Sequence, residues 1–216
     1  MNDLELVAAT GFVEPVLQAE FPGLRLCWTI VEGAPRPSPN PVKQRLGALS
    51  NRYRGASVVA MRTQPVPHAY RAFFRQIGLD PDTSRIPSEE AAVERLMHGG
   101  FRSRDTVSDA LLIGLIETGV PIWALDSETV DEGGLGVRTS LEGEPFGTAG
   151  QSLAAGRLVV ADGLRIHAVL FGGIAPGHEV SPRTKRVTLF SVAVDGVPAI
   201  HVEEAMWITT EVLGTG

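Results

Sequence analysis

The pattern of apolar residues changes at Pro121, and no other feature of the sequence constrains the fold as strongly. Before Pro121, apolar residues recur at helical spacing over about 42–53, 68–77, 87–98 and 105–119. After Pro121 the apolar runs are short and are separated by glycines and acidic residues, which is typical of strands joined by tight turns. The runs are IWAL, GVRTS, RLVVAD, RIHAVLFGG, RVTLFSVAVDG, AIHV and AMWITTEVL, and we interpret all of them as strands. This pattern predicts an α+β protein whose second half is an antiparallel sheet or a small closed barrel.

The segment before residue 42 has its own pattern. Residues 3–19 carry a loose helical pattern that Gly11 and Pro15 interrupt, so two short helices are expected there. Residues 24–31 alternate with a period of two, which predicts the first strand. The stretch 33–41 contains four prolines and is expected to form a loop, with a domain linker as one interpretation.

The ends of two helices are marked by capping residues. Ser88 is the expected N-cap of the helix that begins near Pro87, and two acidic residues follow it in the first turn. Gly99 ends that helix, and Ser103 or Asp105 is expected to cap the next one. This second helix is strongly apolar and is expected to be central in the core.

Composition limits the class of protein. Apolar residues make up 44% of the 216, which is enough to bury a core without disulfides, and Cys27 has no second cysteine to pair with. The first residues lack a basic and apolar leader pattern, and no run of about 18 apolar residues occurs. We therefore expect an unprocessed cytoplasmic protein with no membrane association.

Charge is distributed unevenly along the chain. The stretch between Glu32 and Asp80 contains no acidic residue and eight lysines and arginines, whereas the net charge of the whole chain is -6. Such a stretch can form a surface for phosphates, or its arginines can pair with acids from elsewhere in the fold. The acidic total excludes a uniformly basic nucleic-acid-binding protein, and DNA is not an expected partner.

The common catalytic motifs are absent. The chain has no GxxxxGK[ST], no GxGxxG between a strand and a helix, no HExxH and no GxSxG. A metal or other cofactor is therefore not expected. His178 and Glu179 form a candidate base and orienting acid, although an exposed pair in a turn is the better interpretation. For Asp109, Asp126 and Asp162, capping of a turn is favoured over binding of a ligand amine.

Seven motifs follow one another along the chain: Glu117–Asp126, Val137–Arg138, Glu142–Glu144, Leu158–Asp162, Phe171–Gly173, Thr184 and Val187–Leu189. Their order and spacing resemble the B3/B4 domain of the phenylalanyl-tRNA synthetase β subunit, in a free-standing form. The upstream stretch YRAFFRQIGLDP and the following PSEEAAVERL resemble the first part of the stand-alone family. The resemblance covers about 46–194, so the chain divides into residues 1–41, an N-terminal helical segment, strand and Pro-rich loop, and residues 42–213, a B3/B4-like domain.

The resemblance implies a small closed antiparallel β-barrel with an irregular, largely helical subdomain packed on it. It also implies a site that hydrolyses an amino acid wrongly esterified to tRNA. Backbone donors or a tRNA hydroxyl can assist the attacking water, so no protein nucleophile is required and no catalytic residue is assigned. The candidate ligand-pocket residues are Asp109, Pro121, Trp123, Asp126, Glu144, Gly172, Gly173, Ile174 and Thr184.

Two positions differ from the bacterial synthetase pattern. Trp123 stands where that pattern has a histidine, and Ile174 stands where it has the acid that recognises the tyrosine hydroxyl. An apolar pocket lined by these two side chains suits an uncharged side chain, because isoleucine cannot satisfy a phenol hydroxyl. Tyrosine specificity is therefore not expected. The synthetase's catalytic and anticodon-binding modules are also missing, so we do not expect the chain to charge tRNA by itself.

Three functions remain open at this point. The first is an editing-like module that binds aminoacyl-tRNA, the second is a non-enzymatic protein that binds a free amino acid or a similar small molecule, and the third is an interaction module without chemistry. The acid-free stretch favours the first. The candidate RNA contacts are Arg52, Arg54, Arg71 and Arg75, with Lys185 and Arg186 as a secondary patch.

Overall fold

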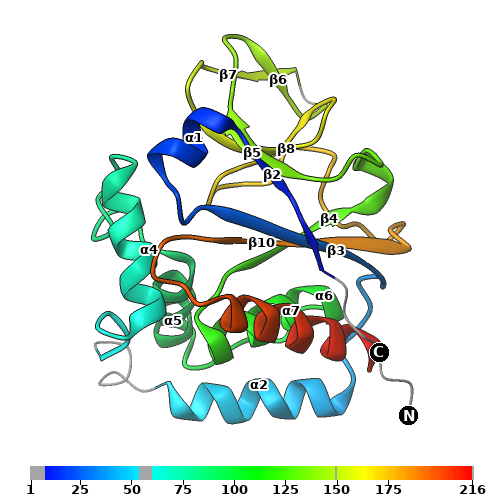
Figure 1. Ribbon diagram of the computed structural model, residues 1–216. Helices are drawn as coiled ribbons and strands as arrows, with labels where there is room; N and C mark the ends of the chain where they lie inside the picture. Colours follow the sequence, from blue (N-terminus) through cyan, green and yellow to red (C-terminus); the bar gives the residue numbers. More distant parts are fainter. Residues whose placement is uncertain (1–7, 54–59, 149, 216) are drawn as a thin grey trace.

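The computed structural model describes residues 8–53, 60–148 and 150–215. Within these ranges the chain forms six α-helices and two β-sheets, so the predicted α+β class is confirmed. Figure 1 shows one sheet in the middle of the molecule, with helices against one side of it and the second sheet on the other side.

The central sheet has four antiparallel strands in the order β1-β3-β10-β4. The strand expected at 24–31 is confirmed as β3, and β3 pairs with β10 along the full length of both strands, from Glu32 opposite Arg186 to Arg25 opposite Ala193. The division of the chain near residue 41 remains a prediction, although this pairing places β3 inside the central sheet. The four strands are β1 (Ala9–Thr10), β3 (Arg25–Glu32), β10 (Arg186–Ala193) and β4 (Ile122–Asp126).

The second sheet has six short strands in the order β2-β5-β8-β9-β6-β7. The pairs β2–β5 and β6–β9 are parallel, and the other pairs are antiparallel. The strands are β2 (Phe12–Val13), β5 (Gly136–Thr139), β8 (Leu158–Ala161), β9 (Ile166–Val169), β6 (Glu144–Phe146) and β7 (Gln151–Leu153).

The expected closed antiparallel barrel is wrong. Neither described sheet closes on itself, because β1 and β4 remain the two edges of the central sheet and β2 and β7 those of the second. One physical reason lies at the C-terminus, where AIHV and AMWITTEVL form one helix, α7 (Ala199–Gly214), instead of two strands. Val202, Met206 and Thr209 recur at helical spacing and are buried, so the helical periodicity prevailed over the β-branched composition.

The helices pack mainly on the central sheet. α6 (Thr106–Thr118) and α7 lie side by side against it, and α2 (Asn40–Arg52) covers α6 from outside (Figure 1). α4 (Pro65–Gln76) and α5 (Pro87–His98) lie at one side of this layer. The predicted helices at 42–53, 68–77 and 87–98 are confirmed by α2, α4 and α5.

The beginning of the described chain differs from its prediction. Instead of two helices, residues 9–20 form β1, β2 and one short helix, α1 (Pro15–Glu20). Gly11 explains part of this difference, since a Cβ there would lie 2.2 Å from the carbonyl oxygen of Leu135. The backbone at Gly11 therefore lies too close to the start of β5 for a helix, whose side chains project in all directions.

Capping follows the prediction at one helix and departs from it at another. Asp105 caps α6, because its Oδ1 accepts the N–H groups of Val107 and Ser108 at 3.0 Å each. Ser88 does not cap α5: Ile86 is the N-cap and Pro87 occupies the first turn. Gly99 and Gly119 end α5 and α6 in the left-handed conformation, with φ of 72° and 77°.

The core lies between the central sheet and the helices. Its fully buried members include Leu26 of β3, Leu189 of β10 and Ile113 of α6. Burying each such side chain stabilises the fold by about 1.5–3 kcal/mol. Among the described residues, no helix has the length and apolar character needed to span a membrane.

Candidate functional site

A small cavity lies between the start of α6, β4 and the segment after β9; we call it the Trp123 cavity. Its volume is about 210 Å³ and its lining is mostly apolar. Trp123 and Ile174 both line it, so the two side chains that the sequence analysis assigned to one pocket do meet at one cavity. The remaining lining residues are Pro35, Asp105, Val107, Ser108, Leu111, Ala124 and Val180.

Trp123 is held in place by two phenylalanines. Its ring stacks on Phe190 of β10, with centroids 5.4 Å apart and an interplanar angle of 13°. Phe171 contacts the same indole edge-on at 5.6 Å. Phe171 has φ of 56°, a conformation that costs a non-glycine residue about 1–3 kcal/mol. The surrounding rings of Tyr70, Phe73 and Phe74 from α4 hold the Phe171 side chain there.

The polar groups of the Trp123 cavity come from the first turn of α6. The Oγ of Ser108 donates to the Oδ2 of Asp105 at 2.6 Å, while the Oδ1 of Asp105 caps the helix. Apart from this carboxylate, this hydroxyl and the Trp123 indole, the side chains that line the cavity are aliphatic. The arrangement suits a ligand with one apolar arm and one polar or cationic group.

A family model described as "B3/4 domain" matches residues 69–212, which is most of the chain. The chain belongs to the B3/4 domain family. Both segments that bring Trp123 and Ile174 together lie inside the matched range. The family was therefore identified correctly from motifs spread over the second half of the sequence.

Two curated relatives carry the same name, "Phenylalanine--tRNA ligase beta subunit". The protein of Syntrophus aciditrophicus (strain SB) is 30% identical over 141 residues, which is 63% of this chain and 16% of the relative. The protein of Geobacter sulfurreducens (strain ATCC 51573 / DSM 12127 / PCA) is 36% identical over 110 residues, 49% of this chain and 14% of the relative. This B3/4 domain thus spans about one sixth of the length of the relatives it matches.

The other predicted pocket residues are dispersed around the B3/4 domain. Asp126 ends β4, and its Oδ2 accepts the hydroxyl of Thr184 at 2.5 Å, so these two residues join the end of β4 to the loop before β10. Glu144 of β6 pairs with Arg138 of β5, and this hydrogen-bonded guanidinium lowers the pKa of the Glu144 carboxyl. Neither arrangement lines the Trp123 cavity.

Three further predicted pocket residues have backbone roles. The carbonyl of Pro121 accepts the hydroxyl of Ser191 at 2.9 Å. The N–H of Gly172 donates to the carbonyl of Val169 at 2.8 Å, and the carbonyl of Gly173 accepts the N–H of Val169 at 3.1 Å. The two glycines thereby form the turn that brings Ile174 to the cavity.

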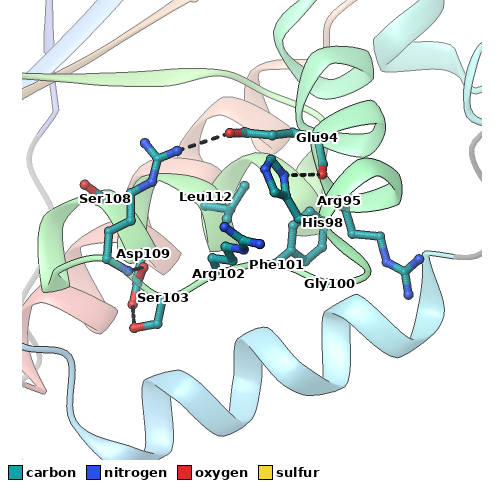
Figure 2. A pocket seen from close by; sticks show the side chains of 11 residues that line it. Glu94, Arg95, His98, Gly100, Phe101, Arg102, Ser103, Ser108, Asp109 and Leu112 are labelled. Carbon is teal, nitrogen blue, oxygen red and sulfur yellow. Dashed lines mark hydrogen bonds and ion pairs between the residues drawn. The ribbon is translucent and has the colours of Figure 1, made fainter.

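Asp109 belongs to a second cavity, of about 380 Å³, which we call the Arg102 cavity (Figure 2). Asp109 is buried and accepts the hydroxyls of Ser38 and Ser103 at 2.6 Å each and the N–H of Arg104 at 2.9 Å. Its role here is to connect the Pro-rich loop and the loop before α6 to the helix. The cavity is lined by Glu94, Arg95, His98, Gly100, Phe101, Arg102, Ser103, Arg104, Ser108, Asp109 and Leu112.

A buried chain of three ionisable side chains lies in and beside the second sheet. The Nε2 of His167 lies 2.7 Å from the Oδ2 of Asp162, and its Nδ1 lies 3.0 Å from the Nδ1 of His178. Burial lowers the pKa of both imidazoles. Burial alone would raise the pKa of Asp162, but hydrogen bonds from His167 and three backbone N–H groups hold it below the ordinary value. The predicted partner of His178, Glu179, instead accepts the N–H of Gly177.

The candidate RNA contacts do not form one surface. Arg71 is buried and its guanidinium binds Glu89 at 2.9 Å and Asp82 at 2.7 Å, so it is withdrawn from the predicted set. Arg52, Arg75, Lys185 and Arg186 are exposed, and Arg54 lies outside the described residues.

The exposed candidates fall into separate places. Tyr70 of α4 donates to the carbonyl of Val192, near the end of β10, whereas Arg186 begins that strand. Six residues separate Arg186 from Val192, which corresponds to about 20 Å along an extended strand. The arginines of α4 and the Lys185–Arg186 patch therefore lie at opposite ends of β10.

The acid-free stretch is partly neutralised by acids from other elements. Arg45 pairs with Glu117 at 2.7 Å and with Glu211 at 3.3 Å, and Arg62 pairs with Asp82 at 3.3 Å. Arg45, Arg62 and Arg71 are thus among the cations of this stretch that pair with acids from other elements. In the described parts of the chain, no group of three or more His, Cys, Asp or Glu residues has the arrangement of a metal site.

Proposed function

We propose that the protein binds an aminoacyl group with an uncharged side chain in the Trp123 cavity and acts on aminoacyl-tRNA as an editing-like module. The observation that carries this proposal is the meeting of Trp123 and Ile174 in one apolar cavity beside the Asp105 carboxylate. The cavity of about 210 Å³ is smaller than typical cavities for drug-sized ligands, so it suits a single amino-acid side chain. The Asp105 carboxylate would face the α-ammonium group.

In this proposal, hydrolysis of the ester depends on positioning. No imidazole, cysteine or lysine lines the Trp123 cavity within the described residues, and the hydroxyl of Ser108 already donates to Asp105. Water would attack the ester carbonyl with help from backbone donors or from the tRNA's own hydroxyl. The names of the relatives support a tRNA substrate, and such a substrate would place the protein in the cytoplasm.

The same lining favours a second candidate, binding of a free amino acid without chemistry. A cavity with one carboxylate, one hydroxyl and no nucleophile paired with a base is sufficient for binding alone. The two candidates share the ligand and differ in the reaction.

Two measurements test the proposal. Thermal unfolding with a series of free amino acids tests the cavity, because a ligand that binds only the folded state raises the midpoint by mass action. Release of labelled amino acid from a panel of mischarged tRNAs tests the reaction, with tRNA retention on filters at two salt concentrations as the binding measurement. A midpoint shift without release selects the binding protein; no shift, no retention and no release refute both candidates.

A further inference from the structure

The Arg102 cavity combines cationic and apolar side chains in a way that the proposed function does not use. Arg102, Arg104 and His98 lie around it, and Phe101 and Leu112 provide apolar surface (Figure 2). With about 380 Å³ it is the larger of the two cavities. Nothing in the sequence analysis singled out these residues, since they lie outside the acid-free stretch.

The charges around the cavity are not balanced. Three arginines line it against two carboxylates, Glu94 and Asp109. Asp109 is already engaged by three hydrogen bonds within the fold. The Glu94 carboxylate accepts one bond, at 3.1 Å, from Arg104. Arg95 is also engaged, since its Nε donates to the carbonyl of Ser50 in α2.

Arg102 is the lining arginine best placed to take an anionic partner. In Figure 2 its guanidinium lies among Leu112, His98 and Phe101. No carboxylate among the described residues pairs with it. A guanidinium offers several N–H groups in one plane, which match the oxygens of a phosphate.

Arg104 can join Arg102 on the same anion at small cost. Its ion pair with Glu94 is exposed on both sides, with 69% and 51% of the two side chains accessible. Exposed pairs of this kind contribute little to stability. A phosphate with its greater charge can therefore replace the Glu94 carboxylate as the partner of Arg104.

The apolar surface indicates what the phosphate carries. The half-buried ring of Phe101 and the side chain of Leu112 line the same cavity as Arg102. Stacking of a base on an aromatic ring beside a guanidinium is a recurrent mode of nucleotide recognition. We propose that the Arg102 cavity binds a nucleotide, with Arg102 and Arg104 on its phosphate and Phe101 against its base.

This inference goes beyond the proposed function and does not require it, because a free nucleotide makes the same contacts as a nucleotide of an RNA strand. The two cavities share Ser108, and residues 108 and 112 lie on one face of α6 while 107 and 111 lie on the adjacent face. A helix is about 10–12 Å in diameter, so one RNA end can reach both cavities.

The test is calorimetric titration of the full chain with AMP, adenosine and a short single-stranded RNA. AMP is expected to bind at least about tenfold more tightly than adenosine, and Arg102→Gln to weaken AMP by about tenfold. Arg157→Gln, an exposed arginine before β8, is the matched control and should leave AMP affinity unchanged. Unfolding midpoints of both variants show whether each is folded.

The outcomes separate the sources and the two proposals. Tighter binding of the RNA than of AMP identifies an RNA strand as the source of the phosphate, and equal affinity identifies a free nucleotide. The inference is overturned if AMP does not bind, if adenosine binds as well as AMP, or if both arginine variants behave alike. If AMP does not bind but a free amino acid still raises the unfolding midpoint, this inference fails and the proposed function stands.

Discussion

The Trp123 cavity and the Arg102 cavity lie on adjacent faces of the first turns of α6, and their linings are opposite in character. The first is built of an indole and aliphatic groups with one engaged carboxylate, and the second of arginines beside a phenylalanine. The walls of the first come from distant segments, whereas the second is lined by residues 94–112 alone. One helix thus separates an apolar cavity from a cationic one, because successive residues of α6 face different sides.

We expect the strongest effect from a substitution in the Trp123 cavity. Trp123→Ala removes the ring that packs on Phe190 and Phe171, and it should lower the free energy of unfolding by about 3 kcal/mol. It should also abolish the amino-acid shift of the unfolding midpoint while AMP affinity stays unchanged in the folded protein. Urea unfolding and calorimetry measure the two quantities. Trp123→Phe is the control. If Trp123→Ala lost the binding of amino acid and of AMP equally, the two cavities would not be separate.

A smaller effect is expected at Asp109, which connects the Pro-rich loop and the loop before α6 to that helix. Asp109→Ala leaves the donors of Ser38, Ser103 and Arg104 without their acceptor, which should cost about 2 kcal/mol. Since Ser103 and Arg104 line the Arg102 cavity, AMP affinity should fall more than amino-acid affinity does. Urea unfolding and paired titrations of Asp109→Ala and Asp109→Asn measure this. If amino-acid affinity fell more than AMP affinity, Asp109 would support the Trp123 cavity and not the Arg102 cavity.

Acid is expected to lower the stability of the whole fold, and both cavities depend on that fold. The lowered pKa values of His167 and His178 mean that the unfolded chain binds protons which the folded chain does not. The free energy of unfolding should therefore decrease as pH falls through about 6.5, and the lowered pKa of Asp162 extends the loss to lower pH. Urea unfolding at several pH values measures the slope. His178→Gln should make this pH slope shallower, whereas His68→Gln, at an exposed histidine, should leave it unchanged. Equal slopes in the two variants would refute the assignment of the pH dependence to the buried histidines.

The smallest effect is expected at the edge of the cationic cavity. Glu94→Gln removes the carboxylate that competes for Arg104, so AMP affinity should rise by about twofold. The free energy of unfolding should change by less than about 0.5 kcal/mol, because the ion pair is exposed. Calorimetry at low salt measures the affinity. Weaker AMP binding in this variant would mean that Glu94 positions Arg104 instead of competing for it.

Local signals predicted much of the fold. The alternation at 24–31, the helices at 42–53, 68–77, 87–98 and 105–119, the N-cap candidate Asp105 and the helix end at Gly99 were predicted, because each depends on residues close in sequence. The C-terminal helix was missed, since its β-branched residues indicated strands while burial against the central sheet favoured a helix. The open sheets were missed because strand pairing between distant segments leaves no local pattern.

The candidate site was predicted only in part for the same reason. Trp123 and Ile174 were paired through the resemblance, and the structure brings both to one cavity. Asp126 and Glu144 were carried over with them, but they are engaged by Thr184 and Arg138 away from that cavity. The Asp162–His167–His178 chain could not be predicted, because the approach of the two imidazoles depends on the turn after β9.

Phe171 has a consequence for the size of the Trp123 cavity. Its ring lies between the indole of Trp123 and the aromatic side chains of α4, and its backbone is fixed in the left-handed region. A change in the bulk of Phe73 or Phe74 would therefore move the indole without altering any residue that lines the Trp123 cavity. Variation in a helix about fifty residues upstream of β4 can widen or narrow this cavity while every lining residue stays the same.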